Sequence, residues 1–285
     1  MANMTAADLI KNNFELYSLP DTVYKLINLV NDPDHTNHDA AEIICQDPGI
    51  TMRLLKIVNS PFYNFPAQVN SIEMAITILG SNQLRNLVLA TSVINQFSLD
   101  NNSLLSTNDF WRHSVGCGTA ARILAGFLEM HNGEELFTAG LLHDIGHMVM
   151  VTAMPEETAI LYDKSGAPGV DLATIETAEF GFDHAEVGGA LMEHWNLPSS
   201  IIEAVAFHHS PQKASQYRTN AAVIHIANLI TNAAVGTLPC DGPRTCDPWA
   251  WKILNVDGDI LQQVEEKLNE KMSDFLQMFV HDKAA

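Results

Sequence analysis

Residues 137–154 read FTAGLLHDIGHMVMVTAM, an apolar run in which His143, Asp144 and His147 are the ionisable side chains. These residues interrupt the run, which therefore falls short of the ~18 consecutive apolar residues that a membrane helix needs. The pattern instead predicts a helix over residues 134–154 that passes through the core of a globular protein. Ionisable groups inside such a helix need compensating partners, and a bound cation is one way to supply them.

Helical periodicity continues on both sides of this run. After the start signal Asp47-Pro48, apolar residues recur at helical spacing through Ile50, Leu54 and Val58. No convincing run of alternating strands is found, so the predicted fold class is all-α. Further helices are expected at residues 20–31, 71–79, 81–97, 108–130, 155–165, 183–195, 198–208, 220–235 and from 248 onward.

A polar segment at residues 98–103 lacks apolar periodicity and separates a histidine-poor third from a histidine-rich remainder. We therefore expect two lobes, residues 1–104 and 105–285. Residues 236–247 concentrate Gly, Pro, Cys and Asp, which is typical of an exposed connection. Reduced thiols are expected for the four cysteines, with a Cys240–Cys246 bridge as the weaker alternative.

The net charge is -19, and protonation of all 12 histidines would leave it negative. Bulk attraction to nucleic acid or to an anionic membrane is therefore not expected. The N-terminus lacks a basic-then-apolar secretion signal, so we expect a cytoplasmic protein.

Polar groups that would be costly to bury alone occur on five predicted segments of the second lobe. They are Asp109 with His113, the pair His143-Asp144, His184, the pair His208-His209, and Asn228. Imidazole and carboxylate together suit iron, manganese, zinc or nickel, whereas magnesium or calcium would favour oxygen ligands. Each segment also has a structural explanation, such as an ion pair, a polar helix end or a capping box.

The order of these groups along the chain resembles the HD superfamily of metal-dependent phosphohydrolases. The resemblance implies an HD-domain, phosphodiesterase-like helical bundle preceded by a smaller helical lobe, and a mononuclear or binuclear metal site. It implies His113, His143 and Asp144 as the first ligands and His184, His208 and His209 as the added ligands of two-metal versions. Asp109 matches a position where multi-metal relatives have a carboxylate, and His147 falls where phosphodiesterases with a Gly-Tyr-Pro signature often have Lys. On this resemblance we predict Asp144 and His147 as catalytic residues.

The sequence departs from that pattern twice. The final ligand is expected to be Asp, but this chain has Asn228, a neutral amide that binds cations more weakly. Ser210-Pro211-Gln212 replaces the Gly-Tyr-Pro signature of the cyclic-dinucleotide phosphodiesterases, which disfavours that substrate. Residues 46–51 (QDPGIT) and 59–63 (NSPFY) resemble the HD-related output domain, or HDOD, family, over roughly residues 15–235.

The HDOD resemblance implies a signal-transduction output module that binds metal, with catalysis weakened or lost, and that engages a signalling protein partner. Residues 60–66 (SPFYNFP) are a candidate partner surface, and the more ordinary alternative is that these rings pack between the lobes. The alternative is an active phosphohydrolase acting on a phosphoester or nucleotide. In that case Arg112 or Lys164 would hold a phosphate.

Overall fold

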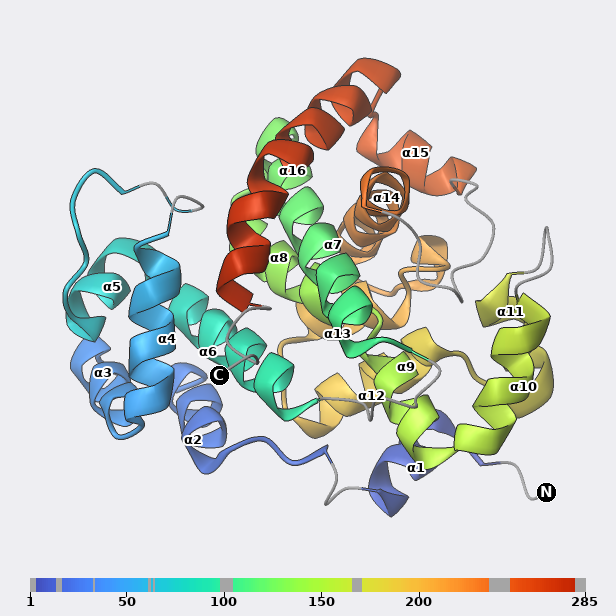
Figure 1. Ribbon diagram of the computed structural model, residues 1–285, viewed down its shortest axis with the longest axis horizontal. Coiled ribbons are helices and arrows are strands. Elements are labelled where there is room, and N and C mark those ends of the chain that lie inside the picture. The colour runs from blue at the N-terminus through green and yellow to red at the C-terminus, as the bar shows by residue number, and fades with distance from the viewer. Residues whose placement is uncertain are drawn as a thin grey trace. The chain divides into compact units, whose positions relative to one another are not determined.

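The computed structural model describes residues 4–13, 17–32, 34–60, 63, 65–97, 105–165, 171–235 and 247–279 (Figure 1). These ranges contain helices and no strand, which confirms the predicted all-α fold class. The chain forms two compact units, residues 1–17 with 99–270 and residues 18–98 with 271–285. Whether residues 1–104 and 105–285 act as separate folding lobes stays a prediction.

The smaller unit is built from five helices at residues 18–98. They are α2 (Asp21–Val30), α3 (Asn37–Cys45), α4 (Pro48–Val58), α5 (Ile72–Leu79) and α6 (Ser81–Gln96). The predicted start signal at Asp47 is confirmed, because its side chain accepts a hydrogen bond from the Ile50 amide at 3.0 Å. Leu26 and Leu54 are fully buried in the core of this unit.

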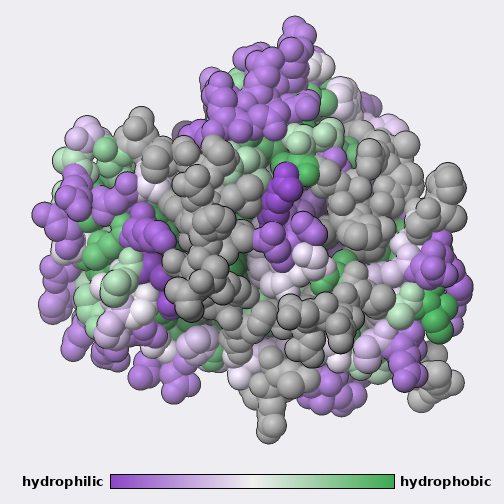
Figure 2. Space-filling view, viewed as in Figure 1, coloured by the Kyte–Doolittle hydropathy of each residue, from purple (hydrophilic) through white to green (hydrophobic). Residues whose placement is uncertain are grey.

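The larger unit holds most of the polar residues singled out above. Its helices are α1 (Ala6–Asn12), α7 (Thr107–Phe127), α8 (Gly133–Leu142), α9 (Ile145–Ala153), α10 (Pro155–Ser165), α11 (Leu172–Phe180), α12 (His184–His194), α13 (Ser199–Ala206), η2 (Pro211–Lys213, a 3-10 turn), α14 (Arg218–Ala234), α15 (Pro248–Leu254) and the start of α16 (Gly258–Phe279). In Figure 2, hydrophilic residues gather over the upper part of the view, where α16 lies.

Close backbone packing brings α7 and α8 together in this unit. A Cβ on Gly118 would lie 2.6 Å from the Phe137 carbonyl oxygen, and one on Gly140 would lie 2.8 Å from the Gly118 Cα. Because neither position has room for a side chain, the two helices approach closely enough to fix the position of His113 relative to the end of α8.

The predicted single helix over residues 134–154 is wrong at its centre. The structure has α8 ending at Leu142 and α9 beginning at Ile145, with His143 and Asp144 between them. His143 Nδ1 contacts the Gly140 carbonyl oxygen at 2.7 Å, and Asp144 takes φ -99° and ψ 8°. The segment Gly133–Ala153 is apolar and long enough to span a membrane by composition, but 89% of its apolar window is buried within the protein.

Three short helices were not predicted, namely α1, α3 and α11, and the region from residue 248 is two helices because Asn255 adopts a left-handed conformation. The described cysteines, Cys45 and Cys117, are not joined in a disulfide. The polar segment at 98–103, residues 236–246 with Cys240 and Cys246, and Phe62 lie outside the described residues.

Candidate metal centre

Six histidines and one aspartate from separate helices converge in the larger unit. His113 comes from α7, His143 and Asp144 from the α8–α9 break, His147 from α9, His184 from the first turn of α12, and His208-His209 from the segment after α13. Each is at most 2% exposed except His209, which is partly exposed. The side chains predicted as metal ligands are therefore brought together.

The Asp144 carboxylate lies at the centre of this cluster. Its Oδ2 is 3.0 Å from Nε2 of His143 and 3.5 Å from Nε2 of His113. Its Oδ1 is 3.5 Å from Nε2 of His208 and 3.6 Å from Nε2 of His184. Neither oxygen has a hydrogen bond of normal geometry from any residue that the structure describes. A buried, ionised carboxylate is unstable unless a positive charge compensates it, and a bound cation is one source of that charge.

The tautomers of three histidines suit metal binding. His143 Nδ1 lies 2.7 Å from the Gly140 carbonyl oxygen, and His208 Nδ1 lies 2.8 Å from the Val205 carbonyl oxygen. His184 Nδ1 lies 2.7 Å from a carboxylate oxygen of another helix. Because each of these partners accepts a hydrogen bond, Nδ1 carries a proton, and Nε2 is the atom that would bind a metal once it is deprotonated. This Nε2 faces Asp144 in His143 and His208, and it faces His209 in His184.

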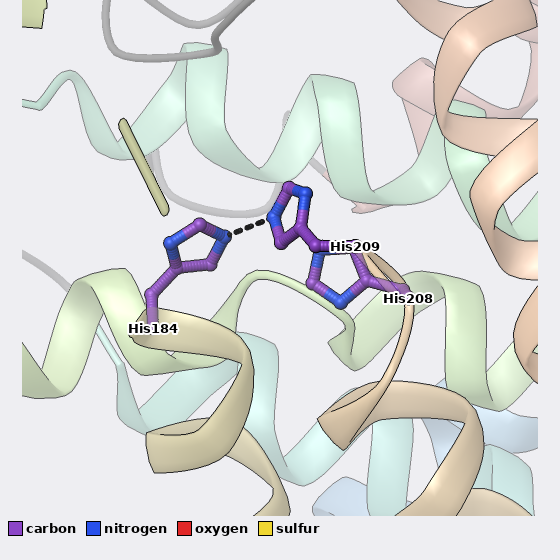
Figure 3. A group of neighbouring side chains, drawn as sticks. All are labelled: His184, His208 and His209. Atoms are coloured by element: carbon purple, nitrogen blue, oxygen red, sulfur yellow. Dashed lines mark hydrogen bonds between the residues drawn. The ribbon is translucent and has the colours of Figure 1, made fainter. Parts of the chain in front are cut away.

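The side chains of His184 and His209 face one another (Figure 3). Their Nε2 atoms are 2.8 Å apart. This is a normal hydrogen-bonding distance, so one of the two nitrogens carries a proton, and a shared cation would require its loss.

Three donor groups meet the spacing required for a metal ion, with ligand atoms within 4.8 Å of one another. They are His113–His143–Asp144, His184–His208–His209 and Asp144–His147–His184. Because Asp144 and His184 occur in more than one group, the cluster can hold a single ion or two ions that share a ligand. The donor set is nitrogen-rich, as the sequence led us to expect.

Charge within the cluster is unevenly distributed. Burial alone would raise the pKa of Asp144. The neighbouring His143, His147 and His184 outweigh this effect and hold the pKa well below its ordinary value. Burial, with the proximity of His184, lowers the pKa of His147 to about 3, while burial lowers those of His208 and His209. Against the effect of burial, Asp144 raises the pKa of His143 well above its ordinary value, so the ionised carboxylate is paired with a protonated His143 beside the neutral His147, His208 and His209. Metal binding would require His143 to lose that proton.

Sequence reasoning missed Glu176 on α11, which is fully buried. Its Oε2 accepts hydrogen bonds from the His184 backbone amide at 2.9 Å and from His184 Nδ1 at 2.7 Å. The Glu176 carboxylate raises the pKa of His184, against the effect of burial, to about 9. Glu176 follows Leu172 and Ala173 at helical spacing, so an acid on an apolar face was a signal that could have identified it.

Tyr162 on α10 was also missed. Its hydroxyl is hydrogen-bonded to His147 Nδ1 at 2.9 Å, and Oε1 of Glu176 lies 3.8 Å from the same nitrogen. The His147 and His184 rings stack with centroids 3.7 Å apart. Tyr162 and Glu176 therefore fix the orientation of both rings from outside the cluster.

Four predicted site residues are not part of the three donor groups. Asp109, Arg112 and Lys164 are exposed, and their predicted ligand and substrate roles stay predictions. Asn228 is 8% exposed, and its Oδ1 accepts a hydrogen bond from Nδ2 of Asn232 at 3.1 Å.

Comparison with known proteins gives a consistent result. A family model for the HDOD domain matches residues 16–211. A crystal structure of a candidate phosphohydrolase from Shewanella amazonensis SB2B superimposes with a TM-score of 0.74 and 28% identity, covering 96% of this chain and 97% of that chain. A candidate signal transduction protein from Marinobacter aquaeolei VT8 has a TM-score of 0.74 and 20% identity, covering 95% of this chain and 61% of that chain.

Among curated proteins, an uncharacterized protein of Treponema pallidum (strain Nichols) is 26% identical over 244 residues, or 82% of this chain. The match spans only 45% of that protein.

Proposed function

Because the chain belongs to the HDOD family, we propose that it is a signal-transduction output module whose buried His/Asp centre binds a transition metal for structure or sensing. The proposal places the protein in the cytoplasm. Iron, manganese, zinc and nickel are the metals that suit a nitrogen-rich set with one carboxylate.

This proposal rests on one observation, which is that the centre is closed to solvent. Among the described residues of the cluster, His113, His143, Asp144, His184 and His208 are at most 2% exposed, and access is limited to the partly exposed His209. Catalytic metal sites usually keep an open coordination position that a substrate can reach, whereas structural sites are closed. Closure therefore favours a structural or sensing metal.

Asn228 supports the same reading. Its amide oxygen is occupied by the Asn232 amide, and it offers no negative charge to balance a second cation. The ordinary metal-binding groups are retained while the final carboxylate is absent, which favours metal binding with weakened catalysis.

The test begins with the metal content of the purified protein after loading with each candidate metal. We expect at least one bound ion per chain in the wild type and loss of binding in Asp144→Ala. Hydrolysis of generic phosphodiesters and nucleotides is then measured for wild type, Asp144→Ala and Asn228→Asp. We expect no turnover by the wild type, and turnover that Asp144→Ala abolishes would overturn the non-catalytic proposal.

A second candidate is an active metal-dependent phosphohydrolase, favoured by the near-complete donor set and by the 28% identical relative described above. When bound, a metal ion supplies a nucleophile at neutral pH and stabilises phosphoryl charge. In this case Asp144 would be shared between ions, and the neutral His147, oriented by Tyr162, would be placed to accept or donate a proton at Nε2. Arg112 or Lys164 would hold the substrate phosphate.

The signalling partner is also part of the proposal. In residues 60–66, Tyr63 and Phe65 are half-buried and their rings stack with centroids 5.8 Å apart. Aromatic rings that are neither buried nor fully solvated are common at protein interfaces, which supports this segment as a partner surface. A Phe65→Ala variant should reduce recovery of the partner in a pull-down, and unchanged recovery would count against this surface.

A further inference from the structure

A groove of about 740 Å³ lies beside α12 and α13 in the larger unit. Its apolar lining includes Phe182, Ala190, Ile202, Ala206 and Phe207. None of these residues belongs to the metal centre. A cavity of this size with an aromatic and aliphatic lining is typical of a binding site.

The charged groups of the groove are all acidic. Glu186 and Glu193 are exposed and Glu203 is half-buried, while the described lining contains no lysine or arginine. Oε2 of Glu203 already accepts hydrogen bonds from the Gln216 and Tyr217 amides, both at 2.9 Å. Oε2 of Glu186 accepts one hydrogen bond, from the Asp183 amide at 3.1 Å, at the start of α12. The exposed carboxylates that the groove presents beside its apolar lining are therefore Glu193 and the second oxygen of Glu186.

Glu186 and Glu193 are two helical turns apart on α12, which separates them by about 10 Å along one face. A ligand that pairs with both carboxylates needs cationic groups at a matching distance, with apolar groups between them. Lysine or arginine residues at positions i and i+7 of a helix meet this requirement, and leucines at i+3 and i+4 then lie on the same face.

The same two helices carry ligands of the candidate metal centre. α12 begins at His184, and α13 is followed by Phe207 and then by His208 and His209. The helices pack so closely that a Cβ on Gly189 would lie 2.6 Å from the Ala206 Cβ. A change in their separation would thus alter the 2.8 Å spacing of His184 and His209.

We propose that this groove docks a basic amphipathic helix of a partner protein, and that docking changes the metal affinity of the centre. Docking follows from the shape and charge of the groove alone. The change in affinity rests on the proposed function, because it requires that the centre binds metal.

Docking is tested on metal-free protein with a fluorescent synthetic helix that carries Lys at i and i+7, Leu at i+3 and i+4, and Ala elsewhere. The control peptide has Glu in place of both lysines. We expect the lysine peptide to bind and Glu186→Gln/Glu193→Gln to weaken binding about fivefold or more, as for two charge pairs. Glu156→Gln/Glu157→Gln removes the same charge from exposed positions of α10 and should leave binding unchanged.

The contribution of the groove's shape to peptide binding is tested separately from that of its charge. Ala190 is half-exposed and lines the groove, so Ala190→Trp should fill the groove and abolish peptide binding without unfolding α12. Gln263→Trp, at an exposed position of α16, is the matched control. Docking in the groove would be overturned if the Glu186/Glu193 and Glu156/Glu157 double variants weakened peptide binding equally, or if Ala190→Trp bound the peptide normally. Displacement of the peptide by tetramethylammonium would overturn the helix as occupant in favour of a small organic cation.

The coupling between peptide docking and metal affinity is tested by titrating the protein with Zn²⁺ or Mn²⁺, with and without saturating lysine peptide. We expect the metal dissociation constant to change about fivefold or more, and the peptide dissociation constant to change by the same factor on metal loading. A bound peptide that leaves metal affinity unchanged would overturn the coupling. Absence of metal binding in the peptide-free wild type would instead overturn the proposed function, while the docking result on metal-free protein would still stand.

Discussion

At the residue scale, the geometry of the candidate centre depends on the groups that hold the histidines in place. Glu176 is fully buried and bonds both the backbone and the side chain of His184. A carboxylate that accepts the Nδ1 proton of a ligating histidine fixes its tautomer and raises its basicity toward the metal. Glu176 therefore acts as a positioning residue for His184 under the proposed function.

The first prediction concerns this residue. Glu176→Gln should lower metal affinity about 10-fold to 100-fold, because a neutral amide orients His184 less firmly and can present the wrong group to Nδ1. Isothermal titration with Zn²⁺ measures the effect. Glu179→Gln, at an exposed position of the same helix, should bind as the wild type does, and equal affinities for both variants would contradict the positioning role.

Sequence reasoning identified the histidines and Asp144 because their order along the chain is distinctive, and the structure brings these residues together. It missed Glu176 and Tyr162, which contact His184 and His147 from neighbouring helices and follow no motif. The apolar face of α11 marked Glu176 as an unusual acid, but its role follows only from its partner, His184.

At the element scale, the long helices were predicted from their apolar periodicity, while the break between α8 and α9 was not. Periodicity reports which face of a helix is buried, and the residues on both sides of His143 and Asp144 are buried all round. The pattern therefore carries no signal for the break. The helices α3 and α11 were missed although the shorter α5 and α13 were predicted. The buried face of α3 is mostly alanine and that of α11 includes Glu176, so neither gives a clear apolar period.

The second prediction concerns the crossing of α9 and α12. A Cβ on Gly146 would lie 1.9 Å from the His184 carbonyl oxygen, so Gly146→Ala must push apart the helices that carry Asp144 and His184. Such overpacking should lower the free energy of unfolding by about 1–3 kcal/mol and reduce metal stoichiometry. Urea denaturation and metal analysis measure the two effects.

Gly133→Ala at the start of α8 is the matched control, because its nearest neighbour would lie 3.7 Å away. It should keep the stability and metal content of the wild type. If Gly146→Ala behaved in the same way, α12 would not be held against α9 by backbone contact, and the geometry of the centre would need another explanation.

At the scale of the whole molecule, every proposed metal ligand lies in the unit of residues 1–17 and 99–270, and so do all four tryptophans. Trp195 is fully buried there, with its indole N–H donating to the Tyr17 carbonyl oxygen at 2.9 Å. Tryptophan fluorescence therefore reports the unfolding of the unit that would hold the metal. The smaller unit contributes only to the circular dichroism of the whole chain.

The third prediction follows from this distribution. A metal that binds only the folded protein should stabilise it by about 2.7 kcal/mol when its free concentration is 100 times the dissociation constant. For a unit of this size, the tryptophan-detected Tm should rise by roughly 5–10 °C. Chelation should reverse the rise, and Asp144→Ala, which lacks the central carboxylate, should show none. A wild type that binds metal without any shift in Tm would mean that the metal binds equally well to the unfolded chain, and the centre could then not serve to hold the fold.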